Sequence, residues 1–227
     1  MREPRRLPAA FVVAGASLWM ATAGNAPLWR ELQRLGLLQA HGGWLLAFTL
    51  AGVLAAALYG LLSLLAWRPL LKPAILLLLF ASAFGAHFMW SYHVVIDSTM
   101  AANTLQTDWR EARGLLTPQL ALAVLGGAVV PSWMVWKTGV RHRPWKQQAL
   151  RNAGGAALAV AVLAGLLLAS FQPLASTMRN HKELRFMLNP LNSLYAAAQA
   201  AFGGPRTKGE LEPVGRDASL LPTAGKP

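Results

Sequence analysis

Five long apolar stretches divide the chain, and each approaches the length that crosses a lipid bilayer. A helix needs about 20 apolar residues to cross the hydrocarbon core, because each residue advances it by about 1.5 Å. The five predicted spans are Leu7–Gly24, Gly43–Ala66, Pro73–Tyr92, Pro118–Trp136 and Asn152–Phe171. The pattern therefore predicts an all-α membrane protein with five transmembrane helices and short interfacial helices outside them.

A polar segment, residues 93–117, separates the third and fourth spans. It is too long for a simple turn between antiparallel helices, and it carries helix-start signals. Asp97 is a candidate N-cap, and Asp108 is followed three residues later by Glu111, which resembles a capping box. We expect two short helices at the outer surface of the membrane that the chain spans. They end before Pro118, which begins the next span.

The region after the fifth span has two parts. Pro190 stands where a helix tolerates proline, and apolar positions then recur at helical spacing, which predicts an interfacial helix over 190–202. From residue 203 to 227, nine of the twenty-five residues are Gly or Pro and no periodicity remains. This composition predicts a flexible linker.

The overall composition agrees with a membrane protein. Hydrophobic residues make up 55% of the 227 positions and charged residues 13%, against about 25% charged in an ordinary soluble domain. The chain has no cysteine and a formal charge of +12. These values exclude a disordered polyelectrolyte, a zinc-finger module and a disulfide-stabilised secreted scaffold.

The distribution of basic residues predicts the orientation in the membrane. With the N-terminus inside, ten of the twenty-one Lys and Arg residues fall in the short inner segments: Arg2, Arg5, Arg6, Arg68, Lys72, Lys137, Arg141, Arg143, Lys146 and Arg151. Cytoplasmic loops carry such an excess. We therefore predict a cytoplasmic N-terminus and a periplasmic C-terminus, and nucleic-acid binding is not needed to explain the charge. A cleavable signal ending at Ala21-Thr22-Ala23 remains an alternative reading of the first span.

Two groups of residues resemble a known family. The first is Ile96-Asp97, Met100, Asn103, Gln106-Thr107-Asp108 and Glu111-Ala112-Arg113, in the outer loop. The second is Arg179-Asn180-His181-Lys182-Glu183-Leu184-Arg185 with Leu188-Asn189-Pro190, Asn192 and Tyr195. Together with the five spans, these motifs make residues 7–202 similar to lipid A phosphoethanolamine transferases, which include the mobile colistin-resistance enzymes.

The resemblance implies a bacterial inner-membrane enzyme. In this family a five-helix membrane domain is joined to a periplasmic, zinc-dependent domain of the sulfatase type. A threonine of that domain takes phosphoethanolamine from phosphatidylethanolamine and passes it to lipid A. By motif position, Asn103, Thr107 and Glu111 would contribute to the lipid-donor site.

The residue types of this triplet fit the donor. A carboxylate such as Glu111 can pair with the ammonium group, and Asn103 and Thr107 can donate hydrogen bonds to phosphate oxygens. The alternatives are a helix cap for Glu111, a turn for Thr107 and a solvated side chain for Asn103. Asp97 is expected to cap a helix, with a supporting role at the donor site as the second interpretation.

Arg179, Lys182 and Arg185 form a basic cluster outside the fifth span. They are candidates for contact with lipid A phosphates or, equally, with anionic phospholipid headgroups. His87 and His93 are six positions apart, which does not match the spacing of metal ligands on a helix, so we interpret them as packing or interfacial side chains rather than a metal site.

No nucleophile motif, phosphate loop or metal-spaced cluster occurs in the sequence. We therefore predict no catalytic and no metal-binding residue in this chain, and zinc is expected in a catalytic domain supplied in cis or in trans. The isolated chain is predicted to be inactive. The alternatives are a stand-alone lipid-binding or scaffolding protein of the inner membrane and, less favoured, a small transporter.

Overall fold

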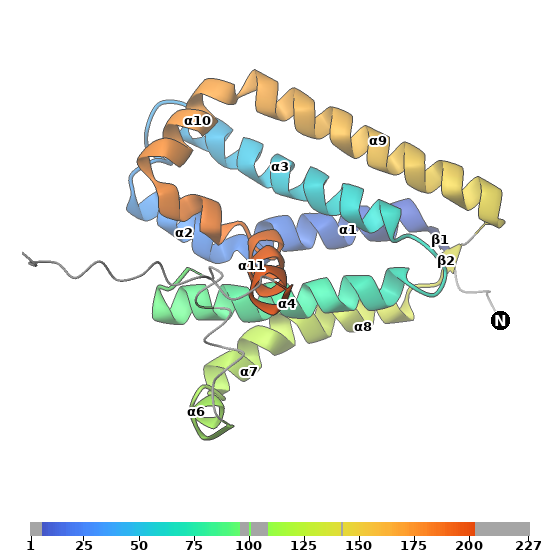
Figure 1. The fold of residues 1–227 in the computed structure, drawn as a ribbon, viewed down its shortest axis with the longest axis horizontal. Helices are drawn as coiled ribbons and strands as arrows, with labels where there is room; N and C mark the ends of the chain where they lie inside the picture. The colour runs from blue at the N-terminus through green and yellow to red at the C-terminus, as the bar shows by residue number, and fades with distance from the viewer. Residues whose placement is uncertain (1–5, 96–99, 101–108, 142, 203–227) are drawn as a thin grey trace, which may run out of the picture.

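The computed structural model describes residues 6–95, 100, 109–141 and 143–202, almost all of them in helices (Figure 1). In chain order the elements are β1 (Leu7–Pro8), α1 (Ala9–Thr22), η1 (Ala23–Asn25), α2 (Ala26–Arg34), α3 (Gly43–Leu64), α4 (Leu71–Tyr92), α6 (Trp109–Gly114), α7 (Pro118–Val124), η2 (Leu125–Val129), α8 (Val130–Lys137), β2 (Val140–Arg141), α9 (Trp145–Ala169), α10 (Phe171–Asn180), η3 (Lys182–Met187) and α11 (Leu191–Phe202).

Five helical stretches are long and apolar enough to cross a membrane, which confirms the predicted fold class. They are Ala9–Arg34, Gly43–Leu64, Leu71–Tyr92, Pro118–Lys137 and Trp145–Ala169. The last begins seven residues before the predicted Asn152, because its first two turns are helical although they are polar. Hydropathy locates the apolar part of a helix and not its first hydrogen bond.

The first apolar helix breaks near the predicted end of its span. A 3₁₀ turn, η1, separates α1 from α2, and Pro27 stands in the first turn of α2. The short helix α2 is strongly amphipathic, and Leu28 and Leu32 on its apolar face are fully buried. Its polar face carries Arg30 and Glu31, which therefore lie at one end of the bundle.

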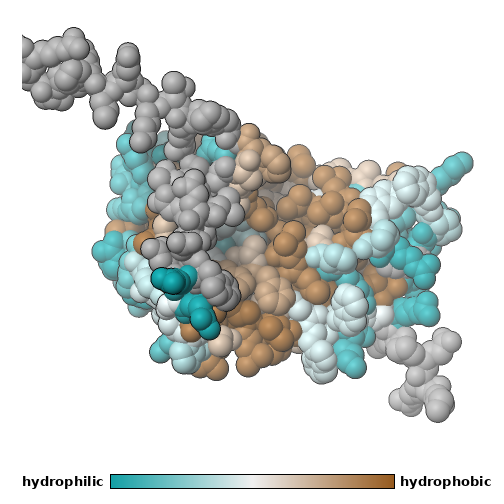
Figure 2. Space-filling view, turned by 60° about the horizontal axis from the view of Figure 1, so that its bottom comes forward, coloured by the Kyte–Doolittle hydropathy of each residue, from teal (hydrophilic) through white to brown (hydrophobic). Residues whose placement is uncertain are grey.

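The core runs along α1, α3 and α4. Met20, Leu62 and Leu79 are fully buried in one cluster, and Leu54 belongs to a second cluster with residues of α2, α10 and η3. In Figure 1, α3 lies between α9 and α1. Figure 2 shows an apolar zone across the middle of one face, with polar side chains gathered at both ends, as expected for a protein surrounded by lipid.

The fourth span is irregular at Pro131. Its helix starts with Thr117 as N-cap, whose Oγ1 accepts a hydrogen bond of 3.2 Å from the amide of Leu120. The π-helical turn η2 comes directly before α8, which contains Pro131. Proline has no N–H for the carbonyl four residues back, which is that of Gly127. The indole Nε1 of Trp19 donates to this carbonyl at 3.2 Å, so α1 supplies the missing donor.

The last described helices fold back onto the bundle. The side-chain amide of Asn189 donates to the carbonyls of Gly24 at 2.9 Å and Ser82 at 2.7 Å. Ser82 lies midway along α4, so α11 starts beside the middle of a spanning helix and crosses it (Figure 1). Tyr195 and Phe202, two of the apolar residues of α11, are exposed on the surface of the molecule.

Candidate functional site

Two neighbouring cavities open at the end of the bundle that carries α2 and the end of α4. The larger, which we call the apolar groove, has a volume of about 750 Å³ and runs between α1, α4, α7 and η2. Its walls include Trp19, Gly24, Ser82, His87, Leu122 and Gly126. A Cβ added at Gly126 would meet no atom within 4 Å, so this glycine leaves the groove open, whereas Gly24 lets Ser82 of α4 approach the break after α1 closely.

The smaller cavity, which we call the polar cavity, has a volume of about 400 Å³ and lies between α2, the end of α4 and η3. Its lining includes the charged or ionisable side chains of Arg30, Glu31, Arg34, His93 and Glu183. Pro27 and Trp90 line both cavities, so the polar cavity and the apolar groove adjoin along these two side chains.

Arg30 lies in the polar cavity, against Trp90, one of the two side chains that both cavities share. Its guanidinium lies 4.5 Å from the centre of the Trp90 ring, donates to the Trp90 carbonyl at 3.3 Å and contacts Nε2 of His93 at 2.5 Å. Because arginine is always a donor, Nε2 of His93 is the acceptor. His93 ends α4 in the left-handed conformation, with φ of 54°. The cation is therefore oriented by an aromatic face and a helix terminus.

The two carboxylates of the polar cavity differ in their partners. Glu31 is paired with Arg34, whose Nε donates to Oε2 at 2.8 Å, and its side chain is only 17% exposed. Glu183 is 46% exposed and lies 3.6 Å from Nδ1 of His181. Glu183 is thus the more accessible acid for a cationic group that enters the cavity.

His87 lies deep in the wall of the apolar groove. It is 7% exposed, and its ring packs edge-on against the rings of Phe88 and Tyr92. Its Nε2 has no hydrogen-bond partner in the part of the chain that the structure describes. Burial against aromatic rings fits the first of the two roles, packing or interfacial, that the sequence suggests for this histidine.

The sequence-predicted donor site falls mostly outside the described residues. Asp97, Asn103 and Thr107 belong to the segments that are not described, and of Glu111 only the backbone, within α6, is described. The segment that contains them leaves from Val95, which lines the polar cavity. It continues through α6 to Gln119, which lines the apolar groove. The first residues of the predicted segment therefore line the polar cavity, and Gln119, two positions beyond its other end, lines the apolar groove.

The predicted basic cluster lies at the end of the bundle where the polar cavity opens. Arg179 is in the last turn of α10, and Lys182 and Arg185 are in η3; all three are exposed and line neither cavity. Sequence reasoning missed Arg30, which the structure places in the polar cavity against Trp90. The available signal was the charged sequence Arg30-Glu31 directly after an apolar span, on a helix whose other face is apolar.

The chain is similar to known proteins over most of its length. Residues 54–202 match the family model described as phosphoethanolamine transferase EptA/EptB. The chain is 33% identical over 202 residues to phosphatidylethanolamine transferase Mcr-1 of Escherichia coli, covering 87% of this chain and 36% of that protein. It is 33% identical over 131 residues to phosphoethanolamine transferase EptA of E. coli O157:H7, covering 56% of this chain and 23% of that protein.

A solved structure has the same fold. The lipooligosaccharide phosphoethanolamine transferase A of Neisseria meningitidis, an integral membrane protein, superposes with a TM-score of 0.79 at 23% identity. The match covers 87% of this chain and 37% of that one, so the chain spans about a third of the length of the relatives it matches. Since the family model covers more than half of the chain, the protein belongs to the EptA/EptB phosphoethanolamine transferase family and corresponds to its membrane domain.

Proposed function

We propose that this membrane domain holds the donor phospholipid, phosphatidylethanolamine, for a phosphoethanolamine transferase that modifies lipid A. The observation that carries the proposal is the junction of the apolar groove and the polar cavity at Pro27 and Trp90. A phospholipid has the same division, with an acyl chain that prefers an apolar surface and a charged headgroup. One phospholipid lying across the junction would place its acyl chain in the apolar groove and its headgroup in the polar cavity.

The charges of the polar cavity match the headgroup. Phosphatidylethanolamine carries a phosphodiester anion and an ammonium cation. The guanidinium of Arg30 is suited to the phosphate oxygens, and the accessible carboxylate of Glu183 is suited to the ammonium. Asn103, Thr107 and Glu111, in the outer loop, are proposed to complete the headgroup site. Arg179, Lys182 and Arg185 are proposed to attract the acceptor phosphates.

The transfer chemistry is assigned to a catalytic domain outside these residues. Among the residues whose placement is described, no three His, Cys, Asp or Glu side chains gather in one place. Relatives are named as phosphatidylethanolamine and lipooligosaccharide phosphoethanolamine transferases. We infer that the chain anchors and supplies such a reaction in the bacterial inner membrane, and that by itself it transfers nothing.

Lipid binding tests the donor site. The full chain in nanodiscs of phosphatidylcholine is titrated with fluorescent phosphatidylethanolamine, and Arg30→Gln and Glu183→Gln are compared with Lys146→Gln, which alters a charge at the opposite end. Loss of one charge-assisted hydrogen bond costs about 1.5–3 kcal/mol, or about tenfold to a hundredfold in affinity. We expect this loss for the two cavity variants only. Unchanged affinity in both would overturn the proposed headgroup cavity.

Two further measurements test the role of Glu111 in donor binding and the inactivity of the isolated chain. Glu111→Ala is titrated in the same way, and an affinity equal to that of the unaltered chain would remove Glu111 from the donor site. The chain is also incubated with zinc, labelled phosphatidylethanolamine and lipid A. Formation of labelled lipid A would contradict the assignment of the chemistry to another domain, while leaving the donor site standing.

A further inference from the structure

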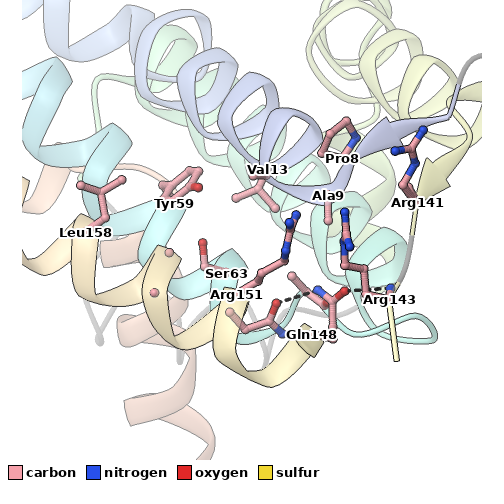
Figure 3. Close-up of a pocket in the computed structure, with 15 residues that line it drawn as sticks. Pro8, Ala9, Val13, Tyr59, Ser63, Arg141, Arg143, Gln148, Arg151 and Leu158 are labelled. Carbon is pink, nitrogen blue, oxygen red and sulfur yellow. Dashed lines mark hydrogen bonds between the residues drawn. The ribbon is translucent and has the colours of Figure 1, made fainter. Parts of the chain in front are cut away.

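A third cavity lies at the opposite end of the bundle, between α1, α3 and α9 (Figure 3). Its volume is about 290 Å³, and Arg141, Arg143 and Arg151 line it together with Gln148 and Asn152. Figure 3 shows the side chains of Arg143 and Arg151 extending toward Ala9 and Val13 of α1, into the same space. We call this cavity the arginine pocket.

The arginine pocket carries three positive charges and no negative one in its lining. Within the described residues, no carboxylate lies within ion-pair distance of any of these three guanidiniums. Like charges gathered at one cavity repel each other, and this repulsion is relieved when an anion enters. An excess of basic residues at this end also follows from membrane orientation. Orientation alone, however, does not require that they share a cavity.

A buried amide in the lining gives independent evidence for a ligand. Asn152 is only 6% exposed, and its Oδ1 accepts a hydrogen bond of 2.8 Å from Nε2 of Gln148. Gln148 also donates to the carbonyl of Ala66 at 3.0 Å and accepts from the amide of Arg143. These bonds fix the orientation of the Asn152 amide. Its Nδ2 is then a buried donor with no partner among the described residues.

A buried donor without an acceptor costs free energy, and an acceptor oxygen from a ligand in the pocket removes that cost. Phosphate oxygens suit this position, because arginine and amide donors both bind them. The remaining walls are apolar or small and include Val13, Leu158 and Gly154. A Cβ added at Gly154 would meet no atom within 4 Å, so no other side chain packs against this part of the lining.

From this combination we propose that the arginine pocket binds the phosphate group of an anionic phospholipid. The guanidiniums of Arg143 and Arg151 and the Asn152 amide hold the phosphate oxygens, and the acyl chain runs past Val13 of α1 and Leu158 of α9. Basic pockets between spanning helices recognise lipid headgroups in this way. The site is separate from the proposed donor cavities, and it does not depend on them.

Native mass spectrometry of the full chain in detergent tests the proposal, with dioctanoyl phosphatidylglycerol, dioctanoyl phosphatidylcholine and inorganic phosphate as probes. We expect phosphatidylglycerol adducts that weaken about tenfold or more in Arg143→Gln/Arg151→Gln. The control, Lys137→Gln/Lys146→Gln, removes the same charge at the same end from residues that do not line the pocket, and it should bind as the unaltered chain does.

Asn152→Asp provides a variant that keeps the fold. It retains the oxygen that accepts from Gln148 and replaces the free donor with an anion, so lipid binding should be lost while the melting temperature is kept or raised. Three results would overturn the proposal: equal loss in both double variants, undiminished binding by Asn152→Asp, or a phosphatidylcholine affinity equal to that of phosphatidylglycerol. Inorganic phosphate that binds as tightly as the lipid would overturn the lipid assignment.

Discussion

Asn25 and Asn189 exchange two hydrogen bonds although 164 positions separate them in the chain. Nδ2 of Asn25 donates to the carbonyl of Asn189 at 2.6 Å, and the amide of Asn189 donates to Oδ1 of Asn25 at 3.0 Å. Both residues have no exposed surface. Since Asn189 also binds Gly24 and Ser82, this pair connects the break after α1, the middle of α4 and the start of α11.

Removing the Asn189 side chain should destabilise the domain. Asn189→Ala removes the donors to the carbonyls of Gly24 and Ser82 and leaves a buried void, with an expected cost of about 2–3 kcal/mol. For a chain of this size, that corresponds to a fall of about 5 °C or more in melting temperature. Thermal unfolding in detergent, followed by tryptophan fluorescence, measures it. Asn180→Ala, at an exposed position, is the control, and an equal fall there would contradict the prediction.

Two glycines give a matched test of the same packing. A Cβ at Gly85 would lie 2.5 Å from Oδ1 of Asn189, whereas a Cβ at Gly165 would meet no atom within 4 Å. Gly85→Ala should therefore lower the melting temperature. Gly165→Ala should keep or raise it, because alanine is favoured over glycine in a helix by about 1 kcal/mol. Equal melting temperatures would show that α11 does not pack against α4 at this point.

Much of the fold could be predicted from the sequence, because hydropathy and helix-start signals are local. The five helices follow from apolar length, and the beginning of the fourth at Pro118 follows from proline at a first turn. Its N-cap, Thr117, was found only in the structure. Even the need to satisfy a carbonyl freed by Pro131 is predictable. The donor to this carbonyl is Trp19. Its identity depends on how α1 packs against η2, which no local sequence pattern reveals.

The candidate sites could be predicted only in part, because they depend on contacts between segments that are far apart in the sequence. From the sequence, Asn189 is only the residue before a predicted helix start. Its hydrogen-bond partners, residues 24, 25 and 82, are far away in the sequence and lie beside it only in the folded chain. In the sequence, Arg143 and Arg151 indicate only the orientation of the chain in the membrane. The cavity that they share with Asn152, which suggests a binding site, is visible only in the structure. The family resemblance led to the prediction of a donor site in the outer loop, which stays a prediction, whereas the position of Arg30 in the polar cavity required the structure.

Filling the apolar groove should weaken donor binding without altering any charge. Gly126 lines the groove, and a Cβ there would meet no atom within 4 Å, so Gly126→Leu places its side chain in the open volume. We expect affinity for phosphatidylethanolamine to fall about tenfold, because an acyl chain loses buried contact worth about 0.8 kcal/mol per methylene. Gly165→Leu, which faces outward on α9, is the control. Equal affinity in the two variants would place the acyl chain elsewhere.

Single cysteines can establish the orientation, because the chain contains no cysteine of its own. Lys182→Cys in η3 and Lys146→Cys in α9 are both exposed and lie at opposite ends of the bundle. If basic loops face the cytoplasm, a membrane-impermeant maleimide should label position 182 in spheroplasts and position 146 only after the membrane is opened. Phe48→Cys, on the apolar surface, should remain unlabelled in both. Labelling of position 146 from outside would place the polar cavity in the cytoplasm, where it could not serve a periplasmic transfer.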